Sequence, residues 1–355
     1  MTSAFVQERL TELGVPFEAG IGGHGVVATL SRGQAQASVA LRADMDALPI
    51  TEMTGLSYAS RNPGVMHACG HDGHTISLLG AAALLVADTS WSGTVHFVFQ
   101  PAEEGYGGSR AMIAAGLFDR FAMTRIFGFH NWPGLDAGTI AVHDGVVMAS
   151  GGRITLTIDG HAGHAGMPHL TRDPVLAAGH LIVALQSIVS RKVDPADTAV
   201  VSLCTIEGGT APNQIAGRVV IRGTLRNHRG PVRETIVEGI ERICAGIATS
   251  FDVTVTPEIT TGQGPVINTP TEASLARMAA EKAQLPLRRD LAPSMAGEDF
   301  AFYLQHRPGA FVWIGNGELR EGAELHGPQY DFNDSILPAT CRWMAEVAKT
   351  ALAAN

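Results

Sequence analysis

The sequence has few cysteines and few charged residues, and it contains no long apolar run. Its 4 cysteines, among 355 residues, lie far apart and form no CxxC pair, which argues against a disulfide framework or a redox motif. The longest apolar stretch, residues 78–86, is far shorter than the roughly 18 residues of a membrane helix. Acidic residues outnumber basic ones, 34 against 25, which argues against a nucleic-acid-binding surface. We therefore expect no nucleic acid and no membrane as partner.

The rest of the composition is typical of a globular cytoplasmic protein. Hydrophobic residues make up 45% and charged residues 17%, which excludes a disordered chain. Glu8 and Arg9 stand within the first ten residues, so no secretory signal is expected there. The length predicts about two domains. Histidine is the unusual residue: there are 14, and histidine is a common metal ligand and acid-base group.

The order of predicted elements indicates an α/β domain that is interrupted by a second domain. Strands are expected at 25–30, 37–41, 94–99 and 126–129, with helices at 1–13, 75–86 and 108–115. Residues 151–259 then follow a β-α-β-β-α-β order, with helices at 173–189 and 232–247, which is typical of a ferredoxin-like fold. Further elements are expected at 271–284, 300–304 and 311–314 and from 338 onward. We expect a domain with a central mixed sheet at 1–149 and 262–355, and an inserted α+β domain at 150–261.

Residues that can bind metal follow several of these strands. Ligands of an open α/β sheet bind outside the carboxyl ends of its strands. The residues found at such positions are Asp44 and Asp46, Glu103 and Glu104, and His130, together with the cluster His67-Ala-Cys69-Gly-His71-Asp72-Gly-His74 before a helix. Each of these, taken alone, is more often a packed, turn or surface residue. Their shared placement at strand ends predicts a metal site.

The mixture of donors indicates two borderline divalent ions. Cys69 and His71 stand two apart, so in an extended segment both side chains point the same way. Cysteine, histidine and carboxylate together suit Zn²⁺, Co²⁺ or Mn²⁺, and there are more donors than one tetrahedral ion needs. A two-metal site can turn a bridging water into a nucleophile. One of the adjacent Glu103 and Glu104 can then bind metal while the other accepts a proton.

One glycine-rich motif is a decoy. Residues 20–25, GIGGHG, match the dinucleotide fingerprint GxGxxG, which must open a helix. Here a β-branched strand follows, so we interpret the motif as a turn.

Seven motifs, in order along nearly the whole chain, resemble the metal-dependent amidohydrolase family of hippurate hydrolase, bacterial N-acyl-amino-acid deacylases and plant indoleacetyl-amino-acid hydrolases. This family is the amidohydrolase branch of peptidase family M20. The motifs are ALRADMDALPI (40–50), MHACGHDGHT (66–75), FQPAEEG (99–105), FHNWPG (129–134), HAGMPH (164–169), MAGEDF (295–300) and LHGPQYDFN (325–333). The resemblance implies a binuclear catalytic domain with an inserted lid domain that mediates dimerisation. It also implies hydrolysis of an N-acyl amino acid, with an acetyl, benzoyl or similar acyl group, to a carboxylate and a free amino acid.

The resemblance also implies a role for individual residues. Two divalent ions per subunit (Mn, Zn, Co or Ni) would be held by Cys69, His71, Glu104, His130 and His326. Glu103 would be the general base and would later protonate the leaving amine. Asp46 would orient a metal ligand.

Four further residues are implied on the substrate side. His164 would stabilise the oxyanion, from the partner subunit in dimeric relatives, with His161 in the neighbouring HAG unit as a competitor. Asn213 and Arg226 would bind the substrate carboxylate, which an arginine grips with two hydrogen bonds. Glu298 would lie near the substrate.

Two alternatives remain. The first is a metallo-dipeptidase or carboxypeptidase of the same superfamily, against which Cys69 argues, because those relatives tend to use His and Asp there. The second is a catalytically dead, metal-binding scaffold, against which the intact Glu103 and ligand positions argue. Family members usually begin with a further helical stretch bearing Arg-Arg and His-Pro-Glu, and residues 1–10 are expected to lie in the helix that follows it.

Overall fold

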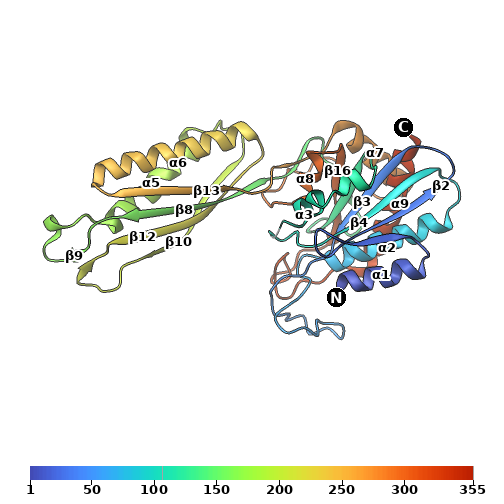
Figure 1. Ribbon diagram of the computed structural model, residues 1–355, viewed down its shortest axis with the longest axis horizontal. Helices are drawn as coiled ribbons and strands as arrows, with labels where there is room; N and C mark the ends of the chain where they lie inside the picture. Colours follow the sequence, from blue (N-terminus) through green and yellow to red (C-terminus); the bar gives the residue numbers. More distant parts are fainter. Residues whose placement is uncertain (106, 355) are drawn as a thin grey trace. The chain divides into compact units, whose positions relative to one another are not determined.

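The computed structural model describes residues 1–105 and 107–354, and these form two compact units (Figure 1). Unit 1 comprises Met1–Val147, Val266–Pro293 and Asp299–Asn355, and unit 2 comprises Met148–Pro265 and Ser294–Glu298. The chain leaves unit 1 after Val147 and returns to it at Val266, so most of unit 2 lies between two segments of unit 1. The short segment Ser294–Glu298 comes after this return and still belongs to unit 2.

Unit 1 is built on a mixed eight-stranded sheet in the order β1-β2-β4-β3-β5-β16-β6-β15. The strands β4, β3, β5 and β16 run parallel to one another, whereas β2 pairs antiparallel with β4, β1 pairs antiparallel with β2, and β6 pairs antiparallel with β16. This confirms the expected mixed central sheet. The bounds are β1 Phe17–Ile21, β2 Gly25–Arg32, β3 Ser38–Asp44, β4 Gly93–Gln100, β5 Ile126–Pro133, β6 Ile140–Ala141, β15 Leu287–Arg288 and β16 Gly309–Gly317; β7 (Val146–Met148) pairs separately with β14 (Val266–Ile267).

Two long helices, α2 (His71–Ala87) and α9 (Leu337–Ala353), pack against each other and over β3, β4 and β5. Gly80 of α2 lies against Cys341 of α9, where a Cβ atom would collide with the sulfur, so this close approach requires glycine. The other helical segments are α1 Thr2–Glu12, α3 Gly108–Ala114, α4 Leu117–Arg120, α7 Pro270–Lys282, α8 Phe300–Leu304 and the 3₁₀ turn η2 Asp334–Ile336.

The central strands carry different side chains on their two faces. Leu41, Phe97 and Val312 belong to the large hydrophobic core together with residues of α2 and α9. Because strand side chains alternate, their chain neighbours Arg42 and Trp313 point to the opposite face.

Unit 2 is an antiparallel four-stranded sheet, β10-β12-β8-β13, with two helices. Its elements follow the predicted β-α-β-β-α-β order, and its own core is formed between the sheet and the helices. The bounds are β8 Ser150–Asp159, α5 Pro174–Arg191, β10 Ala199–Gly208, β12 Arg218–Asn227, α6 Gly230–Phe251 and β13 Thr254–Thr261; β9 Gly163–His164 pairs with β11 Gln214–Ile215, and η1 spans Pro168–Leu170.

Helix α5 corrects one sequence expectation. With 18 residues it is long and apolar enough, by length and composition alone, to cross a membrane, whereas residues 78–86 were expected to form the longest apolar stretch. Its inward face, which includes Leu181, Leu185 and Ile188, is buried in the core of unit 2. This packing is that of a helix in a folded domain.

Candidate metal centre

The donor atoms of the five predicted metal ligands lie together in unit 1. Within each of three overlapping groups, one donor atom per residue lies within 4.8 Å of the others. The groups are Cys69–His71–His130, Cys69–Glu104–His326 and His71–Glu103–Glu104. Residues from four separate stretches of the chain therefore surround one small region, as their placement at strand ends predicts.

Cys69 and His71 are brought together by a turn. The expectation of an extended segment is wrong, because α2 begins at His71 and Gly70, directly before it, has a left-handed backbone (φ 88°). A Cβ atom on Gly70 would also collide with the side-chain oxygen of Asn131. Glycine therefore allows the chain to turn sharply into the helix between the two ligands.

Two other ligand loops contain non-glycine residues with positive φ. Ala102, before the two glutamates, has φ 58°, and His326 itself has φ 67°. The backbone N–H of His326 donates to the Ala68 carbonyl oxygen (2.7 Å), and its Nε2 lies 3.1 Å from Oε1 of Glu104. The Glu104 backbone N–H donates to Oδ2 of Asp46 (3.0 Å). Such backbone strain persists where surrounding contacts hold it, typically at functional sites.

The hydrogen bonds of the buried histidines leave one ring nitrogen of each directed at the cluster. Nδ1 of His130 donates to the Asn131 carbonyl oxygen (2.7 Å), and its Nε2 lies 3.3 Å from the Cys69 sulfur. Nδ1 of His71 lies 3.2 Å from Oδ1 of Asp46. Nε2 of His71 is buried without a hydrogen-bond partner among the residues described, 3.9 Å from Oε1 of Glu104. An orphaned imidazole nitrogen beside a carboxylate and a thiol fits a divalent cation.

Burial shapes the protonation of these ligands. It raises the pKa of the Cys69 thiol to about 12 and holds the pKa of His130 well below its usual range. Burial also lowers the pKa of His71, but attraction to Asp44 and the hydrogen bond with Asp46 outweigh it, so this pKa lies well above its usual value. Metal ligation requires a thiolate and neutral imidazoles, so a cation must displace protons from Cys69 and His71.

A further set of polar residues, whose roles could not be assigned from the sequence, lies next to the candidate ligands. Oδ1 of Asp44 lies 2.6 Å from Nδ1 of His74, and Nε2 of His74 accepts from the Asn131 backbone N–H (3.0 Å). The Asn131 amide in turn donates to the Tyr330 hydroxyl. Asp44 and His74 stood in the strand-end clusters already noted, and that placement was the available signal.

Aromatic rings lie next to the ligand His130. The ring of Trp132 stacks on that of Trp313 at 3.9 Å and 6°, and its edge approaches the His130 ring (6.1 Å). The His143 ring meets the other ring of this stack, Trp313, edge-on at 4.4 Å. The stacked rings therefore lie beside the candidate ligand His130.

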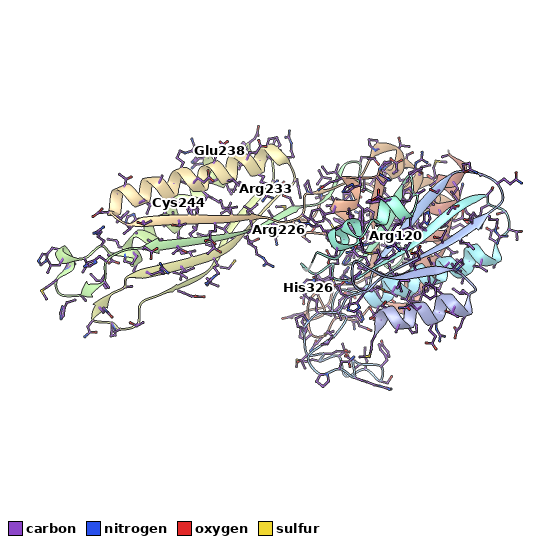
Figure 2. All side chains as sticks on the ribbon, in the orientation of Figure 1. Arg120, Arg226, Arg233, Glu238, Cys244 and His326 are labelled. Atoms are coloured by element: carbon purple, nitrogen blue, oxygen red, sulfur yellow. The ribbon has the colours of Figure 1, made fainter. Side chains whose placement is uncertain are left out.

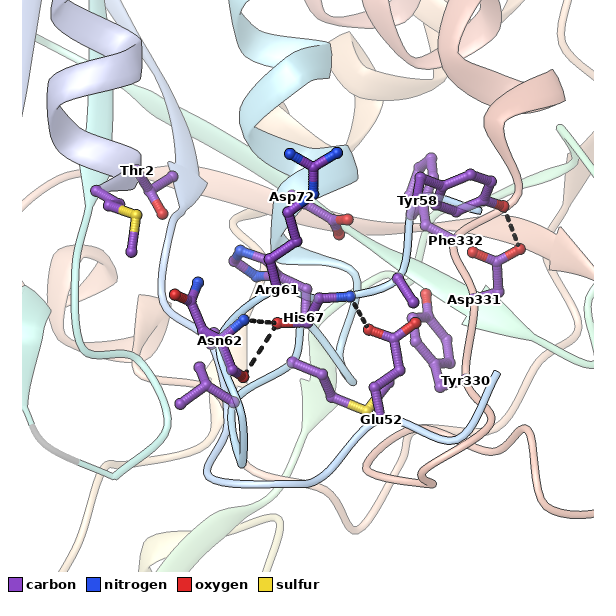
Figure 3. Close-up of a pocket in the computed structure, with 16 residues that line it drawn as sticks. Thr2, Glu52, Tyr58, Arg61, Asn62, His67, Asp72, Tyr330, Asp331 and Phe332 are labelled. Carbon is purple, nitrogen blue, oxygen red and sulfur yellow. Dashed lines mark hydrogen bonds between the residues drawn. The ribbon is translucent and has the colours of Figure 1, made fainter. Parts of the chain in front are cut away.

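A pocket of about 770 Å³ adjoins the segment that carries Cys69 and His71 (Figure 3). Polar lining residues include Glu52, Arg61, His67, Asp72 and Asp331, and apolar ones include Tyr58, Val65, Tyr330 and Phe332. Figure 3 shows the Tyr58 hydroxyl bonded to Asp331. The Ser60 backbone N–H donates to Oε2 of Glu52 (2.7 Å). The lining thus contains three carboxylates and one arginine.

The remaining predicted residues belong to unit 2. His164 is exposed in β9, and the Ala165 backbone N–H next to it donates to the Asn213 carbonyl oxygen (3.0 Å). Arg226 is half-buried near the end of β12, paired with Gly151 (Figure 2). Glu298 is buried, at 1% exposure.

His164 and Asn213 lie beyond the Arg218 end of β12, whereas Arg226 lies near its other end. At about 3.3 Å per residue, eight residues of strand separate these ends by roughly 26 Å. A single copy of unit 2 therefore cannot bring His164 and Arg226 to the same small molecule.

Unit 1 is an α/β domain with a buried cluster of thiol, imidazole and carboxylate donors at its strand ends. A further carboxylate lies beside them. This combination is typical of a metal-dependent hydrolase. The sequence profile of peptidase family M20/M25/M40 matches residues 40–350. The chain belongs to this family, which confirms the resemblance and identifies the protein as a hydrolase.

Named relatives resemble the chain over its whole length. The chain is 38% identical to an N-acetyl-L-cysteine deacetylase of Bacillus subtilis over 355 residues, which cover 100% of the chain and 84% of that protein. It is also 38% identical to a hippurate hydrolase of Campylobacter jejuni, with 98% of the chain and 90% of that protein covered.

A solved structure, the YXEP protein of Bacillus subtilis, described as a dinuclear metal-binding peptidase of family M20, has a TM-score of 0.87 at 34% identity. The alignment covers 99% of this chain and 92% of the YXEP chain.

Proposed function

We propose that this protein hydrolyses the amide bond of N-acyl amino acids and releases a carboxylate and a free amino acid. The observation that carries the proposal is the convergence of Cys69, His71, Glu104, His130 and His326 in unit 1, with Glu103 beside His71 and Glu104. Relatives that are 38% identical are named as deacetylases and hippurate hydrolase, and these enzymes act on this class of substrate. We propose that it acts in the cytoplasm.

The five ligands would hold two divalent ions, of the Mn, Zn, Co or Ni type, and the dinuclear relative supports this number. Bound ions would supply Lewis acidity, which polarises a carbonyl group and lowers the pKa of water. Asp46 contributes by fixing the ring of His71 through Nδ1 and the backbone of Glu104 through its N–H. Both ligands are thereby held in place before a substrate arrives.

Glu103 is the proton acceptor in this proposal. Its Oε1 accepts the backbone N–H of Asp299 (3.2 Å), which orients the carboxylate. It takes the proton from the attacking water and then delivers it to the departing amine nitrogen. Proton transfer of this kind contributes about 10²–10⁴-fold to the rate.

Unit 2 supplies the substrate-binding groups in this proposal and serves as lid and dimerisation domain, while unit 1 is the catalytic domain. Arg226 and Asn213 would bind the amino-acid carboxylate, His164 would stabilise the oxyanion, and Glu298 would lie near the substrate. Because His164 and Arg226 stand at opposite ends of unit 2, a substrate that contacts both needs two copies of the chain. We therefore propose a homodimer.

The test is release of free amine from a panel of N-acetyl and N-benzoyl amino acids by protein loaded with Mn²⁺, Zn²⁺ or Co²⁺, with a chelator control. Metal-dependent release is expected. A Glu103→Ala variant should keep its metal and lose turnover by about 10³-fold. Full activity of this variant would overturn the role of Glu103.

Unblocked dipeptides in the same panel test the alternative. Preferential cleavage of dipeptides would identify a metallo-dipeptidase. The absence of any release from protein with two bound metals would identify a dead scaffold.

A further inference from the structure

Arg42 in β3 is fully buried, at 0% exposure, and the chemistry proposed above gives it no role. A buried arginine is stable only when its fork of donors is satisfied by acceptors. Its Nε donates to Oε1 of Gln100 (2.8 Å), Nη1 to Oδ2 of Asp44 (2.8 Å) and Nη2 to Oδ1 of Asp299 (3.1 Å). One guanidinium thus ties together the ends of β3 and β4 and the start of α8, all within unit 1.

On one side, this fork reaches the metal ligands through Asp44. The Asp44 carboxylate is also fully buried, and its Oδ1 lies 2.6 Å from Nδ1 of His74. Its Oδ2, which accepts from Arg42, lies 3.7 Å from the orphaned Nε2 of His71. The position of this carboxylate is therefore set between the guanidinium and two imidazoles.

On the other side, the fork reaches the base through Asp299. Both oxygens of the Asp299 carboxylate accept from the Gln100 amide (2.7 and 2.9 Å), and Oδ2 also accepts the Ser109 backbone N–H (3.0 Å). The backbone N–H of the same residue donates to Oε1 of Glu103 (3.2 Å). The contacts that fix the Asp299 side chain therefore also fix its backbone N–H, which orients the Glu103 carboxylate.

We propose that Arg42 is a positioning residue, which sets the geometry of Glu103 relative to the metal ligands by binding Asp299 and Asp44 at once. The proposal rests on the proposed function, in which Glu103 is the base. Arg42 touches neither substrate nor metal in this role. A misplacement of about 1 Å at a reacting group can cost about 10²-fold in rate, so a distant buried residue can have a large effect.

The test compares Arg42→Met with Arg125→Met in the full-length, metal-loaded protein. Arg125 is a matched control, because its Nε pairs with the buried Glu272 (3.1 Å) in the same unit, away from the metal ligands. Arg42→Met should lower kcat by about 10²-fold, with KM and the metal content per subunit unchanged. Arg125→Met should lower thermal stability and keep the wild-type kcat.

A second set of variants tests the route of the effect. If Arg42 acts through Asp299, the double variant Arg42→Met/Asp299→Asn should have the kcat of the more impaired single variant, because the two changes break one connection. Arg42→Lys keeps the positive charge beside Asp44 and Asp299 but cannot form three directed hydrogen bonds. It should therefore destabilise the protein less than the methionine variant and still show a reduced kcat.

Three outcomes would overturn the proposal: a wild-type kcat in both Arg42 variants, loss of metal in proportion to loss of activity, or multiplicative effects in the double variant. Inactivity of the metal-loaded wild-type protein towards every N-acyl amino acid would instead overturn the proposed function, and this inference with it. The two failures are distinguishable because they appear in different proteins.

Discussion

At the residue scale, the candidate centre depends on which nitrogen of each histidine carries the proton. His130 donates through Nδ1 to a backbone carbonyl, and His71 uses Nδ1 toward Asp46. Both rings therefore present Nε2 to the cluster, where Cys69 and Glu104 also converge. Outer partners of this kind fix the tautomer and the orientation of the ring and raise its basicity.

The first residue-scale prediction concerns Asp46. Replacing it by asparagine removes the charge that faces Nδ1 of His71 and weakens the acceptor for the Glu104 backbone N–H. We expect Asp46→Asn to bind divalent metal about 10–100-fold more weakly. Competition with a chromophoric chelator measures this directly. Asp72→Asn, an exposed change in the first turn of α2, is the control, and equal affinities of the two variants would contradict the prediction.

At the element scale, β4 carries a buried histidine that has no place in the proposed chemistry. His96 is 5% exposed, its Nδ1 lies 3.0 Å from the Thr29 hydroxyl on β2, and its ring meets Phe121 edge-on. Burial lowers its pKa from 6.5 to about 4. The unfolded chain therefore takes up a proton as the pH falls through 6.5, while the native protein does so only near pH 4. Protons favour the unfolded state in this window, so stability falls as the pH falls.

We therefore expect the stability of the protein to depend on pH through His96, which links β4 to β2. Between pH 7 and pH 5, His96 should remove about 2 kcal/mol from the free energy of unfolding. His96→Gln should show a correspondingly smaller loss. Urea unfolding of the metal-free protein measures it without a contribution from metal release, and His24→Gln, an exposed change, is the control. If the free energy of unfolding of His96→Gln falls with pH as steeply as that of the wild-type protein, other groups cause the loss of stability.

At the scale of the whole molecule, the proposed functional residues are divided between the two units. Unit 1 holds the proposed metal ligands and Glu103, while His164, Asn213, Arg226 and Glu298 belong to unit 2. The long strand β12 keeps Arg226 and His164 apart, so the proposed site is complete only in an oligomer. Closed dimers are the commonest way in which identical chains share such a site.

Mixing two inactive variants tests this sharing. His164→Ala and Arg226→Ala should each lose most activity as pure proteins. After subunit exchange at equal amounts, half of the dimers are mixed and one of their two sites is intact. Activity should therefore return to about a quarter of the wild-type value. A mixture as inactive as its components would contradict a shared site, and so would a monomeric mass by light scattering with full activity.

Much of the fold could be read from local pattern. Buried strands such as β3 and β16 are short apolar runs, and α5 begins with Pro174 after the capping Asp173, so their positions were predicted to within a few residues. The short strands β6, β9, β11 and β15 were missed, because two residues carry no period. Helix α2 begins four residues before its predicted start, because its first turn is made of His71 and Asp72 rather than apolar residues.

The sequence by itself determined the family and the residue types available for metal binding, since both depend on the order of motifs along the chain. Tertiary structure alone decided that Gly70 turns Cys69 toward His71, that Arg42 joins Asp44 to Asp299, and that His164 lies far from Arg226 within unit 2. Local pattern reports only neighbours along the chain. The buried Arg42 pairs with a residue 257 positions away in the sequence, and the two come into contact only after the sheet has formed.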